Sequence, residues 1–580
     1  MRTLLVSLSE HPLAMLRGIA ELRGVELASN ARDEAAAQLA AALGEEAATA
    51  AAVQDLSGKA QAAWTALRRA GGQMKTAAFA REHGEIRAVG PGRLEREATW
   101  RQPENAAEEL WYRGLIFRTF ADFGDGPMEY LYIPEDLPLP PDAGAAPAQA
   151  ARLRGAPLKP VAPPHRGRHA LNSLAVDACT LLSALREEPL ALDERGRPDP
   201  DRAAQLRTTL LLPGAIRFDL LLTLAQANGW LAADRGRLVL DNQRTGAWLR
   251  LTHWEQMSLL YSSWRDGTAW NDLRRTPGLL AEGEWYNDAP LARRRLLRLL
   301  ARLDARSWYA LSDLVDLMKR ADPDFQRPDG NYTGWYLKEA DSGRYLSGFE
   351  NWDAVEGRLL HFLIEGPLFW LGAVALDDEG RDGEDARAAQ HRVQAFRLTP
   401  AGAAWLASRM PQAPPRPARL SVADDFSVTA PLLLPLLDRY RLSRFADPTG
   451  ERDWELRRDT LTPAPTRHRI TRSSLARARV SGLKGQDAVS FLKRAAGGRV
   501  PGRVASAIQR YDRLGGQVRL TRGAVLRVAD AGTLTSLRAD PLIAPLLGDL
   551  ISAQAVLVPE RHLDRLIAIL RDSSYTVELL

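Results

Sequence analysis

The sequence predicts a mainly α-helical chain with small β hairpins, an α+β fold built from tandem winged-helix domains and a further C-terminal α+β domain. Three observations support this prediction. The 580 residues are 45% hydrophobic and 26% charged, as in globular proteins, and they are too many for a single core. A pattern of three helices followed by a two-stranded hairpin recurs irregularly. Two proline-rich stretches, residues 138–164 and 411–417, are typical of extended linkers.

These features divide the chain into six predicted segments. Residues 1–137 are expected to form N-terminal helices and a winged helix, 138–166 a Pro/Ala-rich linker, 167–252 a winged-helix-like domain, 253–410 a helical connector and a winged-helix-like domain, 411–417 a Pro-rich linker, and 418–580 the C-terminal domain.

The first winged helix is predicted between residues 56 and 133. Apolar residues near helical spacing predict a helix over 56–70, which Gly71 and Gly72 end. Shorter helices are expected at 74–82 and 104–113. Strands are expected at 115–120 and 128–133, on either side of a turn-rich loop.

The middle of the chain repeats this pattern. Helices are expected at 174–186, 200–206 and 215–228, with strands at 230–232 and 237–240. A further unit is predicted to start at 293–304 and to contain helices at 308–320 and 352–364, strands at 369–375 and 395–398, and a terminal helix at 399–405.

Motifs for common enzymatic chemistry are missing from the sequence. ATP hydrolysis needs a Gly-x-x-x-x-Gly-Lys-Ser/Thr loop to neutralise phosphates, and the nearest fragments, at 57–59 and 482–485, have the wrong spacing. The nine histidines form no metal-binding cluster, and the single cysteine, Cys179, excludes internal disulfides and multi-cysteine zinc sites. Asp424 and Asp425 could hold Mg²⁺, but a hairpin turn is favoured. We therefore predict no enzyme, no catalytic residue, no metal site and no cofactor.

The same features indicate where the chain functions. No run of about 18 uncharged apolar residues is found, and acidic and histidine residues interrupt the apolar N-terminal stretch. We expect a soluble chain with no membrane partner, and the single cysteine fits a reducing, cytoplasmic location.

Basic residues are concentrated in one part of the sequence. Residues 457–527 contain 17 Lys and Arg against three acidic residues, whereas the rest of the chain contains 60 basic and 69 acidic residues. Clustered cations gain affinity for polyanions because they release phosphate counterions, so this asymmetry favours a polyanionic partner. The alternative is a compositional preference for arginine, since the chain has only seven lysines.

The C-terminal third resembles a known family. The motifs are Arg469-Ile-Thr471, Ser474-Leu475, Gly482, Ala488-Val489, Phe491-Leu492, Val500-Pro501 and Gly515-Gly516-Gln-Val518, followed by the strand 555–559, the helix 563–570 and Tyr575-Thr-Val577. This order is similar to that of the N-terminal accessory domain of XPB-type DNA helicases, here without a helicase motor. One departure is Ser573-Ser574, where a glycine commonly precedes the tyrosine. The resemblance implies a role in binding DNA or partner proteins.

The basic residues of this domain are the predicted DNA contacts. Arg503, Arg510 and Arg513 are spaced to share one helical face, although a solvated amphipathic helix has the same pattern. The predicted DNA-binding residues are Arg467, Arg469, Arg472, Arg477, Arg479, Lys493, Arg494, Arg503, Arg510, Arg513, Arg519 and Arg522.

The predicted winged helices look poorly suited to reading DNA. Glu104, Glu108 and Glu109 dominate the third helix of the first one, and carboxylates repel phosphate. Arginines between 87 and 101 are a weaker candidate for backbone contacts.

We predict a non-catalytic DNA-binding accessory or regulatory protein, in DNA repair or transcription, that contacts the phosphate backbone through its basic C-terminal domain. The alternatives are a protein–protein scaffold that recruits a separate helicase or nuclease, and an enzyme with an unrecognised active site.

Overall fold

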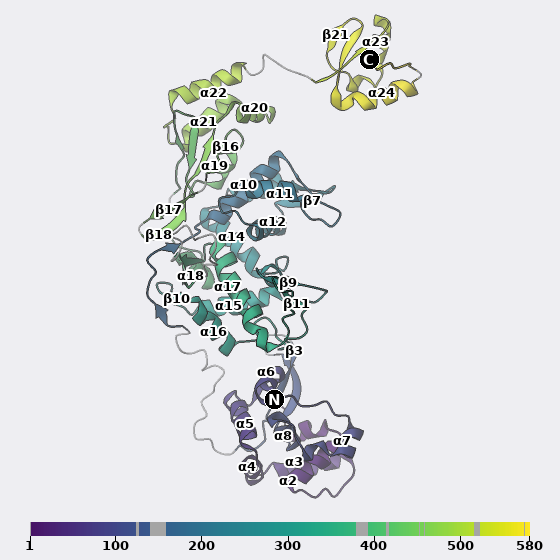
Figure 1. Cartoon of the computed structure of the whole chain (residues 1–580), viewed down its shortest axis with the longest axis vertical. Helices are drawn as coiled ribbons and strands as arrows, with labels where there is room; N and C mark the ends of the chain where they lie inside the picture. Colours follow the sequence, from purple (N-terminus) through teal and green to yellow (C-terminus); the bar gives the residue numbers. More distant parts are fainter. Residues whose placement is uncertain are drawn as a thin grey trace. The chain divides into compact units, whose positions relative to one another are not determined.

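The computed structural model describes residues 2–122, 127–139, 158–378, 393–412, 417–451, 453–457, 459–514, 522–573 and 575–579. About 48% of the chain is helix and about 15% is strand, in several small sheets, so the predicted α+β class is confirmed. The chain (Figure 1) forms two compact units: unit 1 is Met1–Ser421 with Ser427–Arg469, and unit 2 is Val422–Phe426 with Ile470–Leu580. Across the described ranges, no helix is long and apolar enough to span a bilayer.

The N-terminal part of unit 1 packs helices against a three-stranded antiparallel sheet of order β1-β3-β2. The predicted helices and strands are present within a few residues, and β1, which was not expected, pairs Met74 with Leu131 of β3. The winged-helix assignment itself stays a prediction. The elements are α1 (Leu4–Ser9), α2 (Leu13–Arg23), α3 (Arg32–Leu43), α4 (Glu46–Gln54), α5 (Gly58–Arg69), β1 (Gln73–Lys75), α6 (Thr76–His83), α7 (Pro91–Glu97), α8 (Ala106–Tyr112), β2 (Phe117–Asp122) and β3 (Pro127–Tyr132).

The middle part of unit 1 is mostly helical. Several of its helices begin at side-chain caps: Asp199, Asp241, Thr252 and Asp288 each accept a backbone N–H of the first turn. The elements are α10 (Ser173–Glu187), β6 (Leu190–Ala191), α11 (Pro200–Arg207), α12 (Ala215–Ala227), β7 (Leu231–Asp234), β8 (Arg237–Leu240), α13 (Asn242–Leu249), α14 (His253–Asp266), β9 (Leu279–Ala281), α15 (Ala289–Leu300), β10 (Trp308–Ala310), α16 (Leu311–Ala321), β11 (Leu337–Glu339), α17 (Arg358–Leu363), β12 (Val374–Asp377), β13 (Ala395–Leu398) and α18 (Pro400–Leu406).

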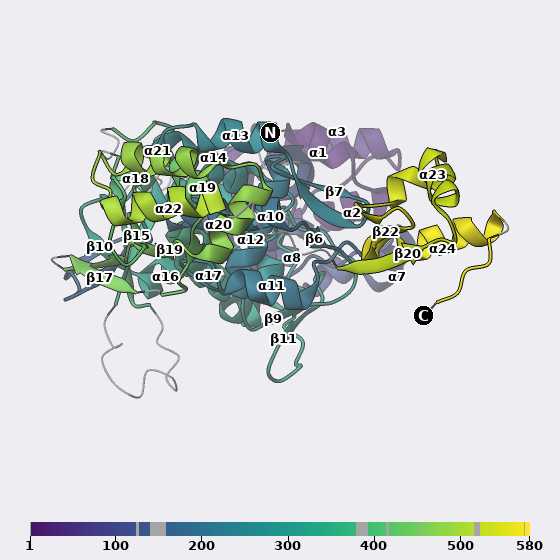
Figure 2. The same cartoon turned by 90° about the horizontal axis from the view of Figure 1, so that it is seen from above.

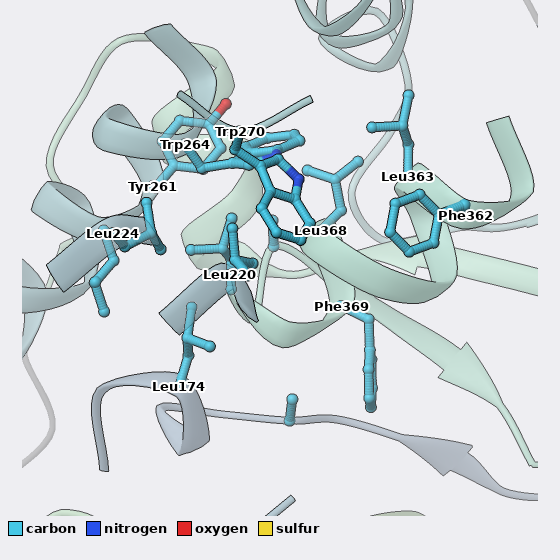
Figure 3. Packing of buried hydrophobic residues seen from close by; sticks show 14 of the residues in the cluster. Leu174, Leu220, Leu224, Tyr261, Trp264, Trp270, Phe362, Leu363, Leu368 and Phe369 are labelled. Carbon is cyan, nitrogen blue, oxygen red and sulfur yellow. The ribbon is translucent and has the colours of Figure 1, made fainter. Parts of the chain in front are cut away.

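One large apolar core holds this part together. Figure 3 shows residues of α10, α12, α14 and α17 meeting in it, together with Trp270, Leu368 and Phe369. Trp264 and Leu363 are fully buried there. Burial of such large side chains is the main stabilising contribution of the fold, at about 25 cal/mol per Å² of apolar surface.

A seven-stranded sheet joins segments that are distant in the sequence. Its order is β17-β18-β5-β12-β13-β10-β4, and β18 runs parallel to β5. The strands not yet given are β4 (Pro160–Val161), β5 (Gly167–Arg168), β17 (Trp454–Arg457) and β18 (Thr460–Pro463). Residues 308–310, predicted to begin a helix, instead form β10, because Tyr309 pairs with Phe396 of β13.

Residues 427–469 pack with unit 1, although the sequence analysis placed them in the C-terminal domain. Leu432 and Leu436 are buried in the large core, and Asn172 Nδ2 donates to the Leu432 carbonyl at 2.8 Å. The elements here are β14 (Ser421–Val422), β15 (Ser427–Ala430), α19 (Leu436–Leu442), β16 (Asp447–Pro448) and β19 (Thr466–Arg469). Asp424 and Asp425 form the predicted turn between β14 and β15.

Unit 2 begins with three helices that lie side by side in both views (Figures 1 and 2). The first starts at a capping box between Thr471 and Ser474. A small sheet of order β20-β22-β21 follows, with its own core around Leu537, Val558 and Leu566. The elements are α20 (Arg472–Val480), α21 (Gly485–Ala495), α22 (Gly502–Leu514), β20 (Gly523–Arg527), α23 (Ala531–Ala539), β21 (Leu550–Ser552), β22 (Ala555–Pro559) and α24 (Leu563–Asp572).

Candidate nucleic-acid interface

Three exposed arginines lie along α22. Arg503, Arg510 and Arg513 are exposed, whereas Val504 and Ile508 are buried. The apolar residues therefore fix which side of the helix packs, and the arginines face solvent. Among the described residues, none of the three arginines forms an ion pair.

Helices α20 and α21 add further cations next to α22. Arg472, Arg479, Lys493 and Arg494 are exposed, and Arg477 is half-buried. Together with the three arginines of α22, these residues form what we call the basic helix group. Eight of the twelve predicted DNA-binding residues belong to it.

Local contacts hold the basic helix group together. Arg479 Nη1 donates to the Asp512 carbonyl at 3.4 Å, which ties α20 to α22. The Gly485 N–H donates to Asp512 Oδ2 at 2.9 Å, at the start of α21. A Cβ at Gly485 would lie 2.7 Å from Asp512 Cβ, so glycine permits this close approach. Asp512 is therefore occupied by structural contacts.

The other four predicted residues lie outside the basic helix group. Arg467 and Arg469 are exposed on β19 in unit 1, and Arg467 pairs with Glu451 at 2.9 Å. Arg522 is exposed before β20 and pairs with Glu560 at 3.2 Å. Arg519 lies outside the described residues.

Two cations that the sequence analysis did not single out adjoin the same helices. Lys484 immediately precedes α21, and Arg499 lies between α21 and α22; both side chains are exposed. Both lie within the basic stretch 457–527, which was the signal available in the sequence.

The acidic residues of α8 have structural partners. Glu108 is fully buried and accepts hydrogen bonds from Arg87 Nε and Nη2, both at 2.6 Å. Burial opposes its ionisation, but the hydrogen bonds and charge of Arg87 outweigh burial and lower the pKa of Glu108. Glu109 accepts from the Ser57 hydroxyl at 2.6 Å. These carboxylates hold α5 and the 85–105 segment in place.

The arginines between residues 87 and 101 also form ion pairs with carboxylates of the N-terminal part. Arg93 bonds Glu97 at 2.9 Å and Arg101 bonds Glu21 at 2.5 Å. Together with Arg87, three of the four arginines already contact carboxylates, so phosphate contacts there would compete with existing ion pairs.

Glu356, which precedes α17, also has structural partners. Glu356 is 1% exposed and accepts from Arg327 Nε at 2.6 Å and from Gln326 Nε2 at 3.0 Å. Burial raises the pKa of Glu356, although Arg327 favours its charged form. This buried pair orders the 325–357 region and is not exposed to a partner.

Neither a metal cluster nor a reactive thiol is evident in the described part of the chain. There, no group of three or more His, Cys, Asp or Glu residues is arranged to hold a metal ion. Cys179 is buried in α10, and burial raises the pKa of its thiol to about 11, so the thiolate is disfavoured.

A comparison with protein families identifies the class to which this segment is related. A family model described as a helicase conserved C-terminal domain matches residues 461–552, which include the basic helix group. A search of curated proteins finds no match to the chain. The matched segment is therefore helicase-related.

Proposed function

We propose that this chain is a non-catalytic DNA-binding accessory or regulatory protein that contacts the phosphate backbone through the basic helix group. The observation that carries the proposal is that exposed cations gather on three neighbouring helices inside the helicase-related segment. Guanidinium and ammonium groups on such a surface release counterions when they meet phosphates, which gives affinity without base recognition.

The proposal includes the finer resemblance to the accessory domain of XPB-type helicases, which rests on the motifs between Arg469 and Val577. A non-catalytic role is proposed because the sequence contains no phosphate-binding loop of the Gly-x-x-x-x-Gly-Lys-Ser/Thr type. DNA repair and transcription are the processes in which such a helicase-related DNA binder would act.

Reversing the three charges on α22 is expected to weaken DNA binding. In the full-length Arg503→Glu/Arg510→Glu/Arg513→Glu variant, affinity for duplex DNA should fall roughly 100-fold or more near 0.1 M salt, because three phosphate contacts are lost. The slope of log affinity against log salt should fall by about 2.7. Fluorescence anisotropy with single-stranded, duplex and forked DNA across a salt series measures both quantities.

The matched control is Arg538→Glu/Arg565→Glu/Arg571→Glu, which makes the same change of charge at exposed positions on α23 and α24. We expect this control to bind nearly as tightly as the wild type. Equal weakening of both variants would mean that net charge, and not the basic helix group, determines affinity.

A second candidate function is a scaffold that recruits a separate helicase or nuclease. The observation that favours it is the exposure of Leu550 and Ile551 on β21, an edge strand of the sheet of unit 2. Exposed apolar side chains close together are typical of protein-binding surfaces. Absence of DNA binding by the wild type at low salt would favour this candidate.

A further inference from the structure

A basic cleft lies in unit 1, far in sequence from the basic helix group. Its volume is about 700 Å³, and β1, β3 and α6 line one wall while α15 and α16 line the other. The basic lining residues are Lys75, Arg81, Arg295, Arg298, Arg302 and Arg320. The acidic lining residues are Glu82, Asp322 and Asp324. The cleft is thus cationic, although the chain outside residues 457–527 has a net negative charge.

One row of cations comes from α15. Arg295 and Arg298 are three residues apart, so they project from one side of the helix, and Arg302 follows in the turn after the helix ends. Leu296 and Leu300 of the same helix are fully buried in the core of unit 1, which fixes the arginine side toward the cleft.

The two aspartates of the cleft are already bound to arginines. Arg81 forms a two-point contact with Asp324, Nη1 to Oδ1 at 2.6 Å and Nη2 to Oδ2 at 3.0 Å. Arg295 Nη1 lies 2.7 Å from Asp322 Oδ2. These pairs hold the walls of the cleft in place and neutralise the negative charge of both aspartates.

Two further arginines remain available to a ligand. Arg298 and Arg320 are exposed. Within the described part of the chain, neither one forms an ion pair. Arg320 also lies in the last turn of α16, where the helix dipole favours a cation, so its position there is stable without a carboxylate.

The remaining lining is mostly apolar and small. It comprises Ala66, Ala70, Met74, Ala78, Leu299, Met318, Ala321 and Pro323, with Tyr130 and the polar Gln73. Unpaired bases stack on aromatic side chains such as Tyr130 regardless of base identity, while the phosphates follow the cations. A duplex cannot present its bases in this way because they are paired in its interior.

We propose that this cleft binds a short stretch of single-stranded nucleic acid, with its phosphates on Arg298 and Arg320 and its bases against the apolar lining. The site is separate from the basic helix group, so the two proposals can succeed or fail independently. Together they would give the chain two nucleic-acid contacts of different preference.

The test uses the full-length Arg298→Glu/Arg320→Glu variant and a short oligothymidylate in anisotropy titrations. Loss of two phosphate contacts should weaken single-strand binding on the order of 10-fold or more near 0.1 M salt and lower the salt slope by about 1.4. Duplex binding should change much less. The control, Arg250→Glu/Arg306→Glu, makes the same change of charge at exposed residues outside the cleft and should match the wild type. Unaltered single-strand affinity in the cleft variant overturns the proposal.

Two further measurements separate this proposal from its alternatives. Photocrosslinking of a 5-iodouridine-substituted strand to the full chain should mark peptides that contain Met74, Tyr130 or residues 295–324, and crosslinks confined to residues 470–580 would contradict the cleft assignment. ATP tests whether the cleft binds a free nucleotide instead of a strand. If ATP binds as tightly as the oligonucleotide, the ligand of the cleft is a nucleotide. Tryptophan fluorescence of each variant checks that unit 1 remains folded, because all 15 tryptophans lie in it.

Discussion

Replacing Arg293 by methionine is expected to lower the free energy of unfolding of unit 1 by about 3–5 kcal/mol. The Arg293 side chain is fully buried, and its Nε donates to Asp272 Oδ2 at 2.6 Å. The guanidinium also donates to the carbonyls of Trp264, Gly267 and Trp270. Methionine fills similar space but leaves the Asp272 carboxylate and these carbonyls buried without their cation.

Arg294 provides a matched control at the next position. Its side chain is 51% exposed and pairs with Asp288 at 3.2 Å, so Arg294→Met should cost less than about 1 kcal/mol. Urea unfolding followed by tryptophan fluorescence measures both variants and reports unit 1 alone. Equal, small losses in the two variants would show that the buried network around Asp272 contributes little to stability.

Helices were predictable from local sequence because apolar periodicity and end signals lie within each segment. The helices expected at 174–186, 200–206 and 215–228 agree within a residue or so with α10, α11 and α12. The residues that cap these helices, such as Asp199 for α11, can also be predicted from local sequence. The exposure of Arg503, Arg510 and Arg513 on α22 follows from the same periodicity.

Short strands could not be predicted because their partners are distant in the sequence. β5 has only two residues and pairs with both β12 and β18. Trp308 was predicted to begin a helix, but it belongs to a strand because its neighbour Tyr309 pairs with Phe396. Pairing of this kind also draws residues 454–463 into unit 1.

The basic cleft could not be predicted from the distribution of charge along the sequence, for a related reason. Residues 293–306 contain six arginines and one acidic residue, but the other cations of the cleft lie on β1, α6 and α16, so the sequence does not show that these cations meet. Conversely, Glu108 suggested an acidic surface but is a buried partner of Arg87, because burial depends on packing between segments. Helical faces can be predicted from spacing, whereas sites shared by several elements need the tertiary structure.

Unit 1 is expected to lose stability in acid because of His468, which is buried on β19. Burial and the nearby Arg439 cation lower the pKa of His468 to about 3, from an ordinary value of 6.5. Above pH 6.5 the imidazole is neutral in both states, and its contribution to stability is complete. Between pH 6.5 and about 3 only the unfolded chain takes up the proton. Each pH unit in this window therefore removes about 1.4 kcal/mol.

The His468→Gln variant isolates this contribution. Glutamine does not titrate, so the free energy of unfolding of the variant should fall less steeply than that of the wild type between pH 6 and 4, by about 1.4 kcal/mol per pH unit. His11, His169 and His253, whose pKa values are lowered to about 4, keep a residual slope in both proteins. If the slope of His468→Gln equals that of the wild type, burial and Arg439 do not lower the pKa of His468 in the folded state.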